Sequence, residues 1–196
     1  MKHFIKPFFI VALFLLVGQG CIGVSTGGDG VQTSGPAGMF ITTNKGEEWQ
    51  PIVAYPTADG VQNLSSVSVY KIIPDSHDLQ TLYWLSRSNG MFYTTDDGKS
   101  WQRVKGPLAT GFVYDLAIHP TDPCTMYGTN GTFIYKSEDC ARSWEEVYRE
   151  SRAEVGIRTI EFHKFAPFQI VVGSSNGDLL ISNDFGDSWS VSMRLG

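Results

Sequence analysis

The sequence predicts an all-β fold built from repeats of a four-stranded unit, and three observations support this prediction. An eight-residue pattern, Ser/Thr-x-Asp-x-Gly-x-Ser-Trp, occurs four times at regular intervals. Runs of β-branched and aromatic residues lie between the copies, and Asn-Gly pairs mark tight turns within them. A fixed period of this length is typical of an array of similar supersecondary units. The chain is therefore predicted to be a repeat protein.

The clearest copy of the octet spans residues 94–101, and the others span 42–49, 137–144 and 182–189. Their final tryptophans are 52, 43 and 45 residues apart. The residues that define the pattern are, copy by copy, Thr42, Asn44, Gly46 and Trp49; Thr94, Asp96, Gly98 and Trp101; Ser137, Asp139, Ala141 and Trp144; and Ser182, Asp184, Gly186 and Trp189. We expect all of them to have structural roles.

Each octet is interpreted as the tight loop of a β-hairpin. An ionised aspartate accepts hydrogen bonds from the backbone N–H groups that a turn leaves unpaired, and glycine adopts a positive φ without a Cβ clash. The tryptophan begins the next strand and covers the turn from the apolar side. Asn44 replaces the acid in one copy and Ala141 replaces the glycine in another. The loop at 137–144 is therefore expected to have the most distorted geometry.

The four octets resemble Asp-box repeats, the β-hairpin signature of bacterial neuraminidase-type repeats. Such repeats occur in sialidases, xyloglucanases, sortilin-type receptors and photosystem II stability/assembly-factor-like proteins. The resemblance covers residues from about 38 to 193. It implies that the octets lie at the periphery of propeller blades, away from any active site.

The segments between the octets predict three complete four-stranded antiparallel meanders. Their expected strands are 67–73, 81–86, 91–94 and 101–105; 112–120, 125–128, 133–136 and 144–148; and 157–163, 169–173, 179–181 and 189–193. Residues 38–54 supply only the third and fourth strands of another unit. Units of about 45 residues that are apolar on both faces fit the blades of a β-propeller. We expect about three and a half blades of a seven-blade ring, or a ring completed by two such chains.

The first 37 residues predict export and membrane attachment. Lys2 and Lys6 precede an apolar run at 8–17, which is too short to span a bilayer and is typical of a secretory signal. Cys21 resembles the lipidated cysteine of bacterial lipoproteins, with ordinary signal cleavage or an uncleaved anchor as alternatives. The predicted organisation is a signal peptide at 1–20, a lipid-anchored Gly/Ser-rich tether at 21–37, and blades at 38–196. The expected location is the bacterial cell envelope, with a secreted or periplasmic protein as the alternative.

The charge balance argues against a nucleic-acid partner. The chain has 15 Lys and Arg against 20 Asp and Glu, and removal of the first 20 residues would also remove Lys2 and Lys6. Proteins that bind nucleic acid need a positive surface to neutralise phosphates. An acidic chain of this kind is not expected to bind nucleic acid.

Cys124 and Cys140 both fall in the second complete meander. In this topology the start of the second strand lies beside the end of the third, so the two cysteines are expected to be neighbours. An exported chain can retain a disulfide. We predict a Cys124–Cys140 bond that compensates for the weakened turn at Ala141, with two free thiols as the alternative.

Lys71, Asp115 and Glu161 interrupt otherwise apolar first strands of the three meanders. First strands are innermost in a propeller, so these side chains could line the channel and form a polar binding surface. A mutual ion pair or a solvated strand end is the alternative interpretation.

No metal site or cofactor is predicted. His119 and His163 each end the first strand of their own unit, and the repeat template explains this shared position. Four arginines cluster around one connection and could form a basic contact patch, although a charged surface loop is the default interpretation. They are Arg142, Arg149, Arg152 and Arg158.

Three classes of function are compatible with the sequence. The favoured one is a lipid-anchored, non-enzymatic module that presents loops to a protein partner, as the assembly-factor and sortilin resemblance implies. A glycoside hydrolase is the second, but no Arg-Ile-Pro motif is present, and no pair of carboxylates can be assigned although Asp115 or Glu161 could be one member. The third is a carbohydrate-binding or cell-surface structural protein, with an exposed Trp84 and loop tyrosines as platforms. No catalytic residue is assigned.

Overall fold

The computed structural model describes residues 39–52, 54–57 and 60–194 of the chain. The predicted signal peptide (1–20), the tether (21–37) and the lipidation site Cys21 lie outside the described residues. Among the residues described, no helix is long and apolar enough to cross a membrane.

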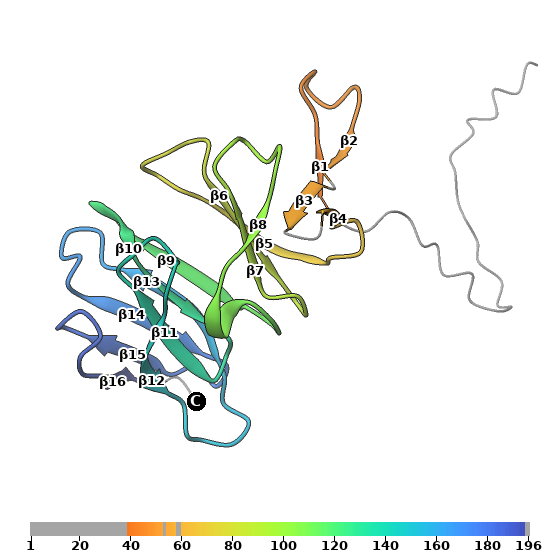
Figure 1. Cartoon of the computed structure of the whole chain (residues 1–196). Helices are drawn as coiled ribbons and strands as arrows, with labels where there is room; N and C mark the ends of the chain where they lie inside the picture. Colours follow the sequence, from red (N-terminus) through yellow and green to blue (C-terminus); the bar gives the residue numbers. More distant parts are fainter. Residues whose placement is uncertain (1–38, 53, 58–59, 195–196) are drawn as a thin grey trace, which may run out of the picture. The chain divides into compact units, whose positions relative to one another are not determined.

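Three four-stranded antiparallel sheets follow one another along the chain, shown in yellow to green, green to cyan, and blue in Figure 1. Each is a meander in which strands adjacent in sequence are paired. The first contains β5 (Val69–Pro74), β6 (Leu82–Ser86), β7 (Met91–Thr94) and β8 (Gln102–Arg103); the second β9 (Asp115–His119), β10 (Asp122–Thr129), β11 (Phe133–Ser137) and β12 (Glu145–Arg149); the third β13 (Ile157–Phe162), β14 (Ile170–Ser174), β15 (Leu179–Ser182) and β16 (Ser190–Met193). The predicted meanders are confirmed, with strand ends displaced by a few residues.

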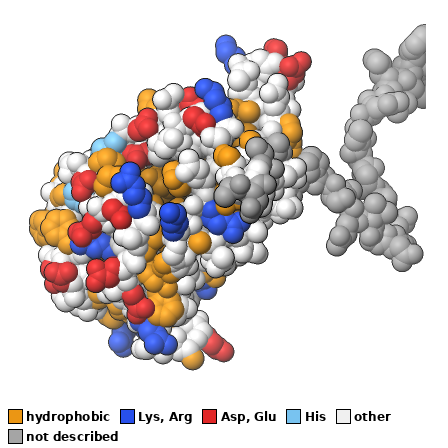
Figure 2. Space-filling view, in the orientation of Figure 1, with side chains coloured by type: hydrophobic (Ala, Val, Ile, Leu, Met, Phe, Trp, Pro, Cys, Tyr) orange, Lys and Arg blue, Asp and Glu red, His pale blue; other side chains and the backbone are white. Residues whose placement is uncertain are grey.

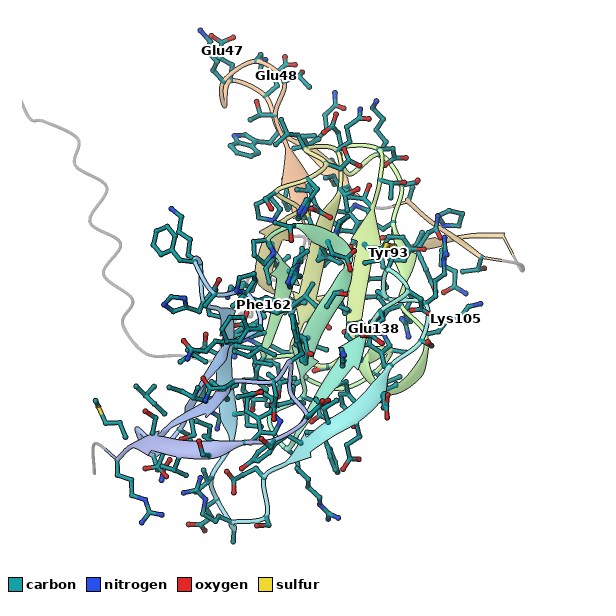
Figure 3. All side chains as sticks on the ribbon, turned by 90° about the vertical axis from the view of Figure 1, so that its left-hand side faces the viewer. Glu47, Glu48, Tyr93, Lys105, Glu138 and Phe162 are labelled. Carbon is teal, nitrogen blue, oxygen red and sulfur yellow. A yellow bond between two sulfur atoms is a disulfide. The ribbon has the colours of Figure 1, made fainter. Side chains whose placement is uncertain are left out.

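Before these sheets the chain forms two separate hairpins. β1 (Met39–Ile41) pairs with β2 (Gln50–Ile52) around the first octet, as expected for the third and fourth strands of a unit. Glu47 and Glu48 lie at the tip of this loop (Figure 3). β3 (Ala54–Thr57) and β4 (Gly60–Asn63) form a hairpin that the sequence did not predict. Proline within β3 argues against a strand in a sequence pattern, and a two-stranded sheet tolerates it because one side of each strand is unpaired.

The core consists of apolar layers between consecutive sheets. Successive strand side chains point to opposite faces, so a strand covered on both sides must be apolar throughout. In β6, Tyr83 and Leu85 pack toward the second meander, whereas Trp84 packs toward the hairpins. Phe162 of β13 lies in the layer between the second and third meanders (Figure 3). Sheets stacked face to face in this way are the packing of propeller blades.

The octet loops share one hydrogen-bond network. In the loop at 94–101, Thr94 Oγ1 donates to Asp96 Oδ1 (2.7 Å) and accepts from the Gly98 N–H (3.0 Å). Asp96 also accepts from the backbone N–H (2.9 Å) and hydroxyl (2.6 Å) of Ser100. Burial raises the pKa of Asp96, but the hydrogen bonds from Ser100 and Thr94 together outweigh it and hold the pKa at about 2. Trp101 Nε1 donates to the Gly98 carbonyl at 3.1 Å.

The loop at 137–144 keeps the acid and hydroxyl network but departs most from the other three loops, as predicted. Ala141 adopts φ 63°, and its N–H donates to Ser137 Oγ at 3.0 Å. The Arg142 N–H donates to Asp139 Oδ1 at 3.1 Å, whereas the equivalent N–H in each of the other loops donates to a main-chain carbonyl. A second difference lies at Trp144. Its Nε1 is buried and has no hydrogen-bond partner among the described residues, whereas the other three octet tryptophans each donate to the carbonyl of the loop glycine. A Cβ holds φ near 60°, while these glycines reach 81° to 95° and can orient the carbonyl toward the indole.

Cys124 and Cys140 are joined by a disulfide in the structure. The Cys140 N–H also donates to the Cys124 carbonyl at 3.2 Å. The other two complete meanders have the same backbone contact, from Asp97 N to the Gln80 carbonyl and from Phe185 N to the Phe168 carbonyl, both at 3.0 Å. The disulfide therefore adds a covalent link to a contact that all three meanders make.

Candidate functional site

The first strands of the three complete meanders are tied together by one buried carboxylate. Asp115 begins β9 and is only 2% exposed. Its Oδ1 accepts from Lys71 Nζ of β5 at 2.6 Å, and its Oδ2 accepts from Thr159 Oγ1 (2.9 Å) and the Ile160 N–H (3.1 Å) of β13. Replacing any one of these donors would leave part of a buried charge unpaired, which is costly.

Glu161 lies on β13, two residues after Thr159, and is solvent-accessible. Partial burial and the negative charge of Asp115 raise its pKa, while Lys71 opposes the shift. The three polar residues predicted to face the channel therefore share one electrostatic environment. Lys71 and Asp115 form the ion pair that was the alternative interpretation, and Glu161 is the member that is not engaged in it.

A second feature lies at the end of the sheets that carries the Asn-Gly turns. Three aromatic rings and two guanidinium groups form a continuous series, which we call the aromatic–arginine strip: Arg87, Tyr70, Phe112, Tyr114 and Arg158. Phe112 stacks on Tyr114 with centroids 3.9 Å apart, and Tyr70 packs edge-on against Phe112 at 4.7 Å. Arg87 lies 5.2 Å from the Tyr70 centroid, and Arg158 lies 4.4 Å from that of Tyr114.

The strip is accessible and cationic. Tyr70, Arg87 and Arg158 are exposed, and neither guanidinium has an acidic partner among the described residues. A guanidinium over an aromatic face retains most of its hydrogen-bonding edge. Elsewhere, acidic and basic side chains are interspersed on the face shown in Figure 2.

Two turn glycines allow the segment that carries Phe112 and Tyr114 to approach the sheets. A Cβ at Gly90 would lie 2.2 Å from the Ala109 carbonyl carbon, and a Cβ at Gly131 would lie 2.6 Å from the Tyr114 ring. Both glycines also have positive φ, as the predicted Asn-Gly turns require. The Asn-Gly pairs thus serve the strip as well as the hairpins.

Several other predicted candidates are located elsewhere. Trp84 is fully buried, so its predicted role as an exposed platform is wrong, because both faces of β6 are covered. Arg152 pairs with Glu150 (2.8 Å) and with Asp178, and Arg149 lies over the Phe133 ring. Arg149 and Arg152 therefore have separate partners, and of the four arginines only Arg158 joins the strip.

His119 and His163 lie in different surroundings. The His119 ring packs edge-on against Phe162 at 5.0 Å, and His163 neighbours Phe165 at 6.4 Å. Within the described ranges, no group of three or more His, Cys, Asp and Glu side chains is placed to hold a metal ion.

Sequence reasoning did not identify Tyr70, Phe112, Tyr114 or Arg87 as site residues. Tyr70 and Phe112 were assigned to β-rich runs, in which alternating aromatic residues are expected to be buried. Their clustering depends on how neighbouring sheets stack, which no local pattern records. Arg158 was singled out, but for a different cluster.

Comparisons with known proteins agree with this architecture. Residues 37–132 match the family model described as Sortilin-Vps10, "Sortilin, neurotensin receptor 3". The chain is 21% identical over 130 residues to a xyloglucanase of Hypocrea jecorina, covering 65% of the chain and 16% of that protein. It is 25% identical over 157 residues to vacuolar protein sorting/targeting protein 10 of Eremothecium gossypii, covering 80% of the chain and 9% of that protein. The chain thus spans a small fraction of each relative.

Similar solved structures are also propellers. The GH74 xyloglucanase from Xanthomonas campestris aligns with a TM-score of 0.60 at 17% identity, over 81% of this chain and 28% of that one. A structure described as YCF48 bound to D1 peptide aligns with a TM-score of 0.52 at 12% identity, over 67% of this chain and 43% of that one. Sequence identity this low shows that the fold is shared and nothing more.

The chain is a β-propeller protein built from Asp-box repeats. The four octets, the stacked meanders and these comparisons together define this class. Within that class it resembles sortilin-type receptors, YCF48 and GH74 xyloglucanase propellers, and it contains part of a propeller.

Proposed function

We propose that this chain is an exported, non-enzymatic propeller module, lipid-anchored through Cys21, which binds a protein partner through the aromatic–arginine strip. The observation that carries the proposal is the exposure of two guanidinium groups, without acidic partners among the described residues, beside three aromatic rings that pack on one another. Tyrosine and arginine are enriched at the energetic centres of protein interfaces. Rigid rings lose little conformational entropy on binding, and arginine supplies directional hydrogen bonds.

The hydrogen bonds that Asp115 accepts argue against hydrolysis at the inner strands. A glycosidase needs one carboxyl group as acid and a second as base or nucleophile. Both oxygens of Asp115 already accept hydrogen bonds from Lys71, Thr159 and Ile160, so this group serves to hold adjacent blades together. A carboxylate whose two oxygens both accept such bonds is not free to attack a sugar.

A glycoside hydrolase is the second candidate, and one observation favours it. The raised pKa of Glu161 is the property that a general acid requires. Its catalytic partner would have to be a carboxylate other than Asp115. The xyloglucanase relatives make xyloglucan the first polysaccharide to test.

Hydrolysis is tested with the intact chain and xyloglucan, by measuring the release of reducing ends. We expect no release above that of a Glu161→Gln variant. Turnover by the natural chain that is lost in Glu161→Gln would replace the binding proposal with the enzymatic one.

Partner binding is tested by site-specific photo-crosslinking in the native membrane. A photoreactive residue replaces Arg87 in one variant and Lys99, in the octet loop at 94–101, in a matched control. We expect a discrete crosslinked species of defined mass from position 87 and none from position 99. Equal crosslinking at both positions, or none at position 87, would contradict binding through the strip.

Anchoring is tested separately by intact mass spectrometry of membrane-extracted protein. The expected species begins at residue 21 and carries acyl mass on that cysteine. A Cys21→Ser variant should leave the membrane fraction. A natural chain that is soluble after export would contradict the anchor without affecting the binding proposal.

A further inference from the structure

Each octet tryptophan of the three meanders shares an apolar layer with one particular position of the preceding unit. This position lies three residues before the first residue of the preceding octet. The pairs are Trp101 with Met39, Trp144 with Met91, and Trp189 with Ile134. The stack of units is therefore held by one contact that is repeated three times.

Trp49, the tryptophan of the first octet, makes no contact of this kind. It is 60% exposed, whereas Trp101 is fully buried and Trp189 is half-buried. Its Nε1 donates to the Gly46 carbonyl at 3.1 Å, so the octet holds the ring as it holds the ring of Trp101. Trp49 is thus fixed by its own loop, but no sheet of the described chain covers it.

The third meander carries the other half of the same contact. Leu179 of β15 lies three residues before the last octet, and Met193 of β16 is its cross-strand partner. In the second meander the equivalent pair is Ile134 and Tyr148, and both lie in the layer that contains Trp189, with the Tyr148 and Trp189 rings 5.7 Å apart. Ile134 is fully buried, but Leu179 is only half-buried and Met193 is 50% exposed.

This open position belongs to a wider apolar face of the third meander. Val171 and Ile181 are paired across β14 and β15, and they lie on the same face as Leu179 because strand side chains alternate. On the opposite face, Val172 and Leu180 are buried against the second meander. The third meander therefore presents on its open face the row of side chains that the second meander covers with the next sheet.

We propose that two copies of this chain associate about a twofold axis, with Trp49 of each copy packed against Leu179 and Met193 of the other. Both halves of the repeated contact are open on one chain, and a twofold axis forms the contact twice. A covered tryptophan buries about 150–250 Å², and a methionine thioether packs well beside an aromatic ring. In the paired copies every octet tryptophan is covered. The proposal depends on neither the aromatic–arginine strip nor the lipid anchor.

The contact is tested by photo-crosslinking of the full chain, extracted from membranes in mild detergent. A photoreactive phenylalanine analogue replaces Trp49 in one variant and Phe165, which is 85% exposed, in a matched control. We expect a species with twice the mass of the chain from position 49 and none from position 165. Peptide mass spectrometry should place the crosslink in β15 or β16. A crosslink to a different protein, a crosslink within one chain, or no crosslink at position 49 would overturn the proposal.

The strength of the association is measured by analytical ultracentrifugation of the same preparation. Met193→Glu places a charge in the contact and should raise the dissociation constant of the two copies by about 30-fold or more. Phe165→Glu introduces the same charge at an exposed position outside the contact and should leave the dissociation constant unchanged. Unchanged circular dichroism spectra establish that both variants fold. A natural chain with the mass of a single copy at micromolar concentration, or undiminished association of Met193→Glu, would contradict the pairing.

Discussion

The octet loops at 94–101 and 137–144 share the hydrogen bonds between their acid, their hydroxyl groups and the nearby N–H groups, but they are completed in different ways. In the first, a glycine carbonyl accepts from the Trp101 indole. In the second, alanine replaces glycine, Trp144 Nε1 has no hydrogen-bond partner in the described part of the chain, and a disulfide fastens the neighbouring residue to β10. The comparison teaches that the acid and the hydroxyl define the loop, whereas the glycine–tryptophan bond can be replaced by another constraint.

Among the changes that distinguish the two loops, loss of the disulfide should lower the free energy of unfolding most. Cys124 and Cys140 are 16 residues apart, and a crosslink that closes such a loop is worth about 3 kcal/mol. The Cys124→Ser/Cys140→Ser variant should lose about that much free energy of unfolding in chemical denaturation. Addition of reductant should lower the stability of the natural chain and leave the variant unchanged.

The presence of the bond in the native protein is checked by intact mass after alkylation. Equal masses with and without reductant before alkylation would mean two free thiols. The loop at 137–144 would then depend on its acid alone.

Removal of the octet aspartate should have the second largest effect on stability, and the effect should differ between the two loops. Asp96→Ala deletes the acceptor of three hydrogen bonds and should cost about 1–3 kcal/mol of unfolding free energy. Asp139→Ala deletes the acceptor of four hydrogen bonds but leaves the disulfide in place, so it should cost less under oxidising conditions. Under reducing conditions the two losses should converge. An Asp139→Ala loss that does not change with redox state would show that the disulfide does not compensate.

A smaller effect is expected from Ala141→Gly. An L-residue at positive φ is strained by about 1 kcal/mol, and glycine is not. The glycine should also let the carbonyl at this position turn toward Trp144 Nε1, as in the other loops. Thermal unfolding of the oxidised protein should therefore shift upward by a few degrees. The reverse change, Gly98→Ala, should lower the unfolding temperature. If neither substitution changes the unfolding temperature, the alanine is not the cause of the missing hydrogen bond of Trp144.

The repeats could be predicted because they are local. The octets, the Asn-Gly turns and the β-rich runs placed three meanders and the half unit of β1 and β2 within a few residues. The contact of Cys124 with Cys140 followed from meander topology. These features depend on chain neighbours or on strand pairing, both of which leave a periodic record in the sequence.

Features that depend on the stacking of one sheet on another could not be predicted. Which sheet covers each face of β6, and hence what surrounds the buried Trp84, depends on this stacking. The strip unites residues from three meanders, and the His119 ring of the second meander neighbours the Phe185 ring of the third. The buried bonds of Asp115 likewise become visible only when three first strands are adjacent.

Low pH should produce the smallest difference between the two loops, because the pKa values of their aspartates are alike. The hydrogen bonds of the octet hold the pKa of Asp96 and of Asp139 at about 2, against about 3.9 for an unfolded aspartate. A pKa that is lower in the folded state gives stability that is complete above pH 4 and is lost as the pH falls toward 2. Asp96→Asn and Asp139→Asn should each flatten the fall in unfolding free energy between pH 4 and 2 to a similar degree. A clearly larger flattening in one variant would mean that the disulfide or the indole bond alters the acid itself, and not only the turn around it.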